Sequence, residues 1–260
     1  MRNMLLTLGL IGGLLAPTIV QAGDEFVPYQ LGDTHVTIWI MTNGAGLTFF
    51  APHDDENTSA TVGMLHVAEH GGKLVQLVYD TKRNIGFTYN GARYAFDPNR
   101  MFSDVGIEAT LKTQGKNYSP EAHALVKQFA RTVLEHVGKG LGQGTPIVAL
   151  HNNSNGSYSL ESYAQGGEYA KEAKAVYQNP KMDTDDFFFV TTDTFFNALK
   201  ERGLNVVLQD NEKVTDDGSL SVLASRMNVP YVNVEAEEGG AGGHETVQAA
   251  MLRILEKVLQ

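Results

Sequence analysis

The chain has 260 residues, no cysteine, and a formal net charge of −10 from 20 lysines and arginines against 30 aspartates and glutamates. The acidic surplus argues against a nucleic-acid-binding protein, because such a protein needs basic groups to neutralise phosphates. Without cysteine, the chain cannot form a disulfide, a thiolate nucleophile, a cysteine zinc finger or an iron–sulfur cluster. Any metal must therefore be bound by histidine, aspartate or glutamate.

Residues 1–22 have the pattern of a secretory signal peptide. Arg2 precedes an apolar run over residues 4–15, and Val20 and Ala22 are small residues at the −3 and −1 positions of a cleavage site. The alternative is an uncleaved membrane anchor, but the apolar run is shorter than the ~20 residues that span a bilayer. We therefore expect cleavage after Ala22 and a secreted protein that is not attached to a membrane after cleavage. If the source is Gram-negative, we expect it in the periplasm.

In the rest of the chain, runs that predict strands alternate with periodic segments that predict helices. The predicted strands are residues 35–39, 46–51, 74–79, 87–94 with a turn near Asn90-Gly91, 145–150, 187–191, 204–208 and 229–235. The predicted helices are residues 58–70, 120–137, 194–202 and 244–259. This alternation is typical of an α/β fold. We expect one domain, residues 23–260, with a mixed, mostly parallel central sheet and helices on both faces.

Three polar clusters follow predicted strands, at the sheet edge where α/β proteins bind ligands. His53 and Glu56 follow the second predicted strand, His151 follows the fifth, and Glu235 ends the last. A histidine and a carboxylate three residues apart can supply two of the three protein ligands of a catalytic zinc, and His151 can supply the third. Taken singly, the clusters have plainer interpretations: an acidic helix start, a hydrogen-bonded structural histidine and a solvated glutamate.

A segment rich in arginine lies between these clusters. Arg93, Asn99 and Arg100 fall within eight residues of a chain that has few arginines. Arginine forms bidentate hydrogen bonds with carboxylates, so this segment could bind the carboxylate of a substrate. The alternative is surface ion pairing with Asp97 or Asp104, which contributes little to stability.

Four segments, in this order, resemble the zinc carboxypeptidase superfamily, in particular its aspartoacylase and succinylglutamate desuccinylase branch. They are H-D-D-E at residues 53–56, R-Y at 93–94 followed by D-P-N-R-M-F at 97–102, L-H-N-N-S-N-G at 150–156, and V-N-V-E at 232–235. The first segment is unspecific by itself, whereas the second and third are fairly specific. The resemblance covers residues 47–238, most of the chain.

The resemblance implies a zinc carboxypeptidase-like fold and a role for each matched residue. The implied ligands of one zinc ion per chain are His53, Glu56 and His151. Arg93 would polarise the scissile carbonyl group, while Asn99 and Arg100 would bind the terminal carboxylate of the substrate. Glu235 would act as the general base and then as the general acid.

The resemblance leaves three points open. Glu237 and Glu238 lie close enough to Glu235 to replace it as the base. The tyrosine that assists carboxypeptidases could be one of four: Tyr158, Tyr163, Tyr169 and Tyr177. The chain ends one helix after Glu235, without room for the extra C-terminal domain of aspartoacylases, so we expect a more open site.

The leading hypothesis is therefore an exported zinc-dependent hydrolase that cleaves an amide bond beside a free carboxylate. A more specific version of this hypothesis is a metallocarboxypeptidase that acts on peptides, including the stem peptides of peptidoglycan. The first alternative is an N-acyl-amino-acid deacylase of the aspartoacylase or succinylglutamate desuccinylase type. The second is a non-catalytic exported protein that binds carboxylates. The sequence indicates no protein partner.

Overall fold

The computed structural model describes residues 23–139, 141, 144–156, 158–237 and 244–259. The expected signal peptide, residues 1–22, lies outside these ranges, so its cleavage stays a prediction. No helix of the described chain is both long and apolar enough to cross a membrane.

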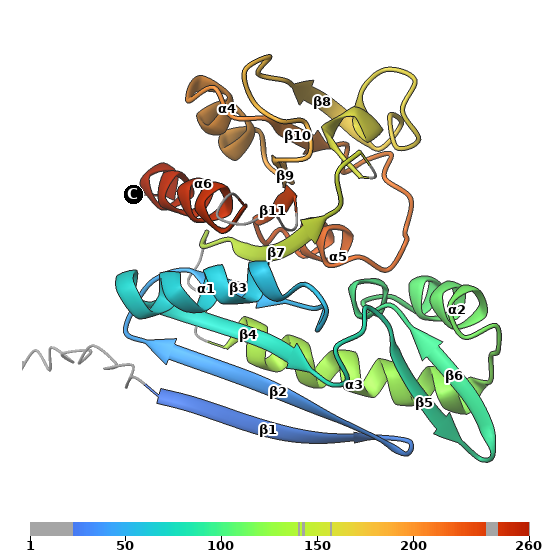
Figure 1. Cartoon of the computed structure of the whole chain (residues 1–260). Coiled ribbons are helices and arrows are strands. Elements are labelled where there is room, and N and C mark those ends of the chain that lie inside the picture. Colours follow the sequence, from blue (N-terminus) through green and yellow to red (C-terminus); the bar gives the residue numbers. More distant parts are fainter. Residues whose placement is uncertain (1–22, 140, 142–143, 157, 238–243, 260) are drawn as a thin grey trace, which may run out of the picture.

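Nine strands in the described ranges form one sheet that runs through the middle of the molecule (Figure 1). In spatial order they are β1 (Gly23–Leu31), β2 (Thr34–Asn43), β4 (Gly72–Val78), β3 (Thr48–Ala51), β7 (Ile147–Asn153), β11 (Tyr231–Glu237), β9 (Phe187–Val190), β10 (Val206–Gln209) and β8 (Ala173–Tyr177). Strands β4, β3, β7 and β11 run parallel at the centre. Parallel pairs do not outnumber antiparallel ones, because the described sheet has four of each.

Successive side chains of these strands point to opposite faces, and a separate apolar core covers each face. Phe50 and Val75 belong to one core, whereas their neighbours Phe49 and Leu74 belong to the other. The first core is covered by α2 (Asp104–Thr113), α3 (Pro120–Gly138) and α5 (Leu220–Arg226). The second is covered by α1 (Asn57–His70), α4 (Asp193–Glu201) and α6 (His244–Leu259). The predicted α/β fold, with a mixed sheet and helices on both faces, is confirmed.

The helix α3 shows how local sequence fixes an element. The Ser119 hydroxyl accepts a hydrogen bond from the backbone N–H of Ala122, and Pro120 occupies the first turn, where its missing N–H costs nothing. The buried side chains of α3 recur at helical spacing, from Val126 through Phe129 to Val133. The predicted helix is therefore confirmed along its whole length.

Two strands and two α-helices of the described structure were not predicted from the sequence: β1, β8, α2 and α5. In addition, the predicted strand 87–94 is a hairpin of β5 (Ile85–Tyr89) and β6 (Ala92–Phe96), which form a separate two-stranded sheet. Its turn has Asn90 at φ 50° and Gly91 at φ 77°, the left-handed backbone that an Asn-Gly hairpin turn requires. The expected turn was thus placed correctly, but it separates two strands.

Candidate metal centre and active site

Three adjacent parallel strands carry the predicted site at their carboxyl ends. His53 follows β3 by two residues, His151 lies in β7, and Glu235 lies in β11 directly opposite His151. The register of β3 and β7 pairs Phe50 with Ala149, so the chain leaving β3 reaches His53 beside His151. The sheet therefore brings together residues that are far apart in the sequence.

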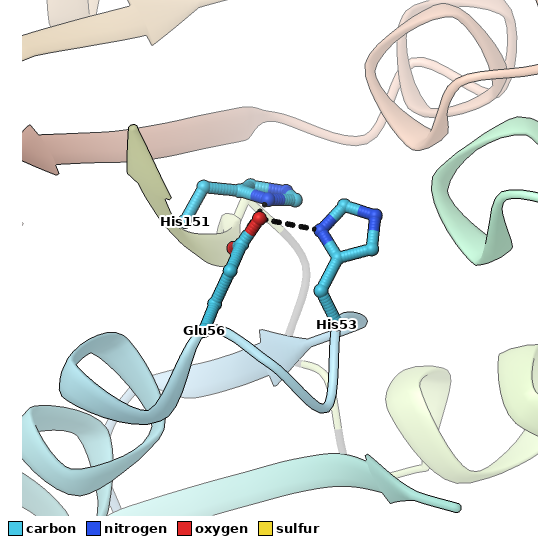
Figure 2. A group of neighbouring side chains, drawn as sticks. All are labelled: His53, Glu56 and His151. Atoms are coloured by element: carbon cyan, nitrogen blue, oxygen red, sulfur yellow. Dashed lines mark hydrogen bonds and ion pairs between the residues drawn. The ribbon is translucent and has the colours of Figure 1, made fainter. Parts of the chain in front are cut away.

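His53, Glu56 and His151 form one buried group, with a ligand atom of each within 4.8 Å of the others (Figure 2). The carboxylate of Glu56 lies between the two imidazoles. Its Oε1 is 2.8 Å from Nδ1 of His53, and its Oε2 is 3.0 Å from Nδ1 of His151. The backbone N–H of Asn152 also donates to Oε2 of Glu56, at 3.1 Å, and fixes the carboxylate against β7.

Asp97 holds the other side of the His53 ring. Oδ1 of Asp97 accepts a hydrogen bond from Nε2 of His53 at 2.8 Å and from the backbone N–H of Asn99 at 2.8 Å. Asp97 is fixed in turn, because its own N–H donates to the hydroxyl of Thr110 in α2. A histidine that donates one ring N–H to a carboxylate presents its other nitrogen in a fixed orientation, as metal-ligating histidines do.

The pKa shifts within this group favour the charged forms of His53 and Glu56. Burial lowers the pKa of His53, but the attraction of Glu56 and the hydrogen bond to Asp97 outweigh it and raise the pKa to about 9. Burial would raise the pKa of Glu56, yet the charge of His53 lowers it well below its usual value. Without a metal, the protonated His53 ring therefore takes the place of a cation between Glu56 and Asp97.

These residues fit a divalent metal ion. Within the described part of the chain, Nδ1 of His53 is buried and makes an ion-pair contact with Oε1 of Glu56 but no hydrogen bond. Two imidazoles and one carboxylate form the donor set of many catalytic zinc sites, and the second-layer carboxylate of Asp97 is the usual companion of such a ligand. The predicted ligand set is thus brought together as one candidate metal centre.

Arg83 is a site residue that sequence reasoning missed. Its Nη1 donates to Oε1 of Glu56 at 2.7 Å, and its Nη2 lies 3.7 Å from Oδ2 of Asp97. The loop that carries Arg83 is fixed by Asp54, whose Oδ2 accepts the N–H groups of Tyr79 and Thr81. The H-D-D-E segment therefore positions both the candidate ligands and this arginine.

The structure does not bring Arg93 to the site. Strand β6 alternates, so that Tyr94 and Phe96 point into the core while Arg93 points into solvent. Arg93 is absent from the described residues that line the cavity beside the candidate metal centre, whereas Arg83 is among them. Of these two arginines, Arg83 and not Arg93 lies at the candidate metal centre.

A cavity of about 400 Å³ opens beside the metal centre and reaches the remaining predicted residues. Its lining includes the candidate ligands Glu56 and His151 together with Glu235, Asn99 and Arg100. The cavity therefore joins the candidate ligands, the candidate base and the candidate carboxylate clamp.

Glu235 is 5% exposed and is held by a hydrogen bond from the side-chain N–H of Asn233 to its Oε1, at 2.9 Å. Burial, with the negative charge of Glu56 adding to it, raises the pKa of Glu235 above its usual value.

Glu237 does not line the described cavity, and its backbone N–H donates to Asp186. Glu238 lies outside the described residues. Of the two glutamates that the structure describes here, only Glu235 lines the cavity.

Three of the four candidate tyrosines, Tyr158, Tyr163 and Tyr169, line the cavity together with Tyr231. The hydroxyl groups of Tyr158 and Tyr163 are hydrogen-bonded to each other. The fourth candidate, Tyr177, lies in β8 and packs against the core on the other side of the sheet. The structure thus removes Tyr177 from the choice and adds Tyr231.

No protein-family model matches this sequence, and no curated protein matches it. Among solved structures, the chain is similar to the crystal structure of the succinylglutamate desuccinylase from Chromobacterium violaceum. The match has 15% sequence identity and a TM-score of 0.45, and it covers 93% of this chain and 72% of that chain. The likeness concerns the fold alone.

Proposed function

We propose that this protein is a zinc-dependent hydrolase that cleaves an amide bond beside a free carboxylate, most simply as a metallocarboxypeptidase acting on peptides. One observation carries the proposal. A single cavity is lined by Glu56 and His151 of the His53–Glu56–His151 group, by Glu235, and by Asn99 and Arg100. Metal ligands, a base and a group that binds a carboxylate thus face one space, as the hydrolysis of such a substrate requires.

His53, Glu56 and His151 would hold the metal. Zinc bound by such ligands acts as a Lewis acid and lowers the pKa of a coordinated water toward ~7. Glu235 accepts the proton of the attacking water and returns it to the nitrogen of the leaving amine. Its raised pKa suits both steps, because a carboxyl group that must donate as well as accept a proton works best with a pKa nearer neutrality.

Arg83 and Arg100 supply positive charge to two different parts of the substrate. When substrate takes its place in the cavity, Arg83 can exchange its bond to Glu56 for the oxygen on which negative charge develops. Arg100 and Asn99 line the same cavity and bind the terminal carboxylate of the substrate. Two fixed positive groups thus define where the scissile carbonyl group and the terminal carboxylate lie.

The preference for peptides rests on space and on the expected export. A cavity of about 400 Å³ lies within the range that holds drug-sized ligands, which are larger than a small N-acyl amino acid. An exported enzyme would meet peptides, including peptidoglycan stem peptides. The export itself follows from residues 1–22 and would be tested by N-terminal sequencing of the protein recovered outside the cytoplasm.

The test of the proposed function is product analysis by mass spectrometry with the zinc-loaded protein. N-acetylated peptides, muropeptides and N-acyl amino acids would be supplied in parallel, with and without a chelator. We expect loss of one C-terminal residue from the peptides, abolished by the chelator and restored by zinc. Cleavage of N-acyl amino acids alone would favour the deacylase, and no product from any substrate by a zinc-loaded protein would overturn the proposal.

A further inference from the structure

The part of the cavity around Arg100 has an unusual charge arrangement. Nε of Arg100 lies 3.2 Å from Oδ2 of Asp217, so the expected clamp for the substrate carboxylate already has a negative partner. Glu172 lines the same part of the cavity and interacts electrostatically with both Asp217 and Arg100. One positive and two negative charges meet here, and we call Arg100, Asp217 and Glu172 the distal cluster.

Glu172 is the member of the distal cluster that lacks a positive partner of its own. No hydrogen bond or ion pair of its side chain is found in the described part of the chain. Partial burial and the charge of Asp217 raise its pKa, while Arg100 acts in the opposite direction. The nearby Lys213 is engaged elsewhere, because its Nζ donates to Asp210 at 2.8 Å.

Gln209 adds an unpaired acceptor beside Glu172. It lies opposite Ala173 in the β10–β8 ladder, and the N–H of the next residue donates to the backbone oxygen of Glu172 at 2.7 Å. Gln209 is 1% exposed and lines the cavity, and its Oε1 has no hydrogen-bond partner among the described atoms. Its orientation is fixed, because Nε2 donates to Oδ1 of Asn211. A buried acceptor without a donor is costly unless a ligand supplies one.

Aromatic rings complete the wall of this end of the cavity. Tyr158, Tyr163 and Tyr169 lie within 6.2 Å of one another, centroid to centroid. Arg100 interacts electrostatically with all three of these tyrosines, which places them around the distal cluster. Tyrosine rings pack against alkyl chains and attract cations through their faces.

We propose that the distal cluster selects substrates whose C-terminal residue carries a positively charged side chain, an ammonium or a guanidinium group, which binds Glu172 and Asp217. The inference rests on the proposed function, since it assumes that Arg100 binds the terminal carboxylate. A neutral residue would bring one more negative charge to a cluster that already has an excess of one. A cationic residue brings its carboxylate to Arg100 and its positive charge to the acids that surround Arg100.

The experiment compares two peptides that differ only in the charged group, N-acetyl-alanyl-lysine and N-acetyl-alanyl-norleucine. For the zinc-loaded protein we expect kcat/KM to be about tenfold higher for the lysine peptide, the effect of one charge-assisted hydrogen bond in a partly buried site. Glu172→Gln should remove most of this preference, chiefly through KM, and Glu172→Lys should turn it toward a peptide that ends in glutamate. Glu161→Gln, an exposed acid of the same segment that does not line the cavity, should change nothing.

Calorimetric binding of free lysine and norleucine to the zinc-loaded protein separates this inference from the proposed function, because it needs no turnover. If neither peptide is cleaved but lysine binds more tightly in a manner that depends on Glu172, the distal cluster is as proposed and the hydrolase is not. Equal or better cleavage of the norleucine peptide would overturn the inference. A preference for lysine that survives Glu172→Gln, or no binding of either amino acid together with no cleavage, would overturn it as well.

Discussion

The two ends of the cavity are built differently. At the metal end, every ligand comes from the carboxyl end of a central parallel strand or from the turn that follows one. Two of the three are held by a further group, His53 by Asp97 and Glu56 by the backbone N–H of Asn152. At the distal end, Glu172 comes from a loop, shares Arg100 with Asp217, and makes no hydrogen bond or ion pair with its side chain in the described part of the chain. Rigid strand ends suit a metal and a reacting bond, which require fixed geometry. A loop with unpaired charge suits the recognition of variable side chains.

The largest effect is expected at the metal end, from the candidate base. Glu235→Gln keeps the shape of the side chain but removes its ability to accept a proton, so kcat should fall by about 10²–10⁴-fold. Zinc content, measured by mass spectrometry, should stay at one ion per chain, since Glu235 is not among the candidate ligands. Glu161→Gln is the control, because this exposed acid does not line the cavity, and it should leave kcat on the norleucine peptide unchanged. Near-wild-type activity of Glu235→Gln would show that another residue is the general base.

Two arginines ten residues apart distinguish the structural assignment from the sequence prediction. Arg83→Met should lower kcat/KM by about 10²–10³-fold, because it removes a fixed positive group from the reacting carbonyl oxygen. Arg93→Met should have no measurable effect, because Arg93 lies exposed on β6. Steady-state kinetics of both variants with one peptide decides between them. The opposite result would restore the assignment made from the sequence.

The metal end should also govern the stability of the metal-free protein in alkali. The pKa of His53 is raised from 6.5 to about 9 in the folded protein, so the protonated ring stabilises the fold fully below pH 6.5. That contribution, on the order of 3 kcal/mol, is lost as the pH rises from 6.5 through 9. Urea unfolding in a chelator at several pH values should show this loss in wild type and not in His53→Gln. Parallel curves for the two proteins would contradict the ion pairing of His53 with Glu56 and Asp97.

A smaller effect is expected from the carboxylate behind His53. Asp97→Asn removes the charge that orients the His53 ring, and zinc affinity should fall by about 10–100-fold. Asp104→Asn is the control, because this exposed aspartate also accepts a hydrogen bond from a histidine, His123, but lies outside the candidate metal centre. Competition with a chelating dye measures both affinities. Equal losses in the two variants would show that the effect is one of general charge.

Local sequence was enough wherever one segment decides its own structure. The helix α3 has a serine cap, a proline in its first turn and a periodic apolar face, and β7 begins with a continuous apolar run, residues 147–150, and is buried along its length. By contrast, β1 exposes residues on both faces and is a strand because β2 pairs with it from end to end. A strand whose stability comes from its neighbour carries little signal of its own.

The sequence by itself predicted the class of the fold, because strands and helices alternate in local patterns, and a family resemblance implied His53, Glu56 and His151 as metal ligands. Only the tertiary structure decided which arginine reaches the site and which acids face the cavity. Arg93 matched a motif, but the alternation of β6 turns it outward, whereas Arg83 reaches Glu56 through a loop held by Asp54. Arg100, Glu172 and Asp217 meet only after three separate segments pack together, and no local pattern encodes that meeting.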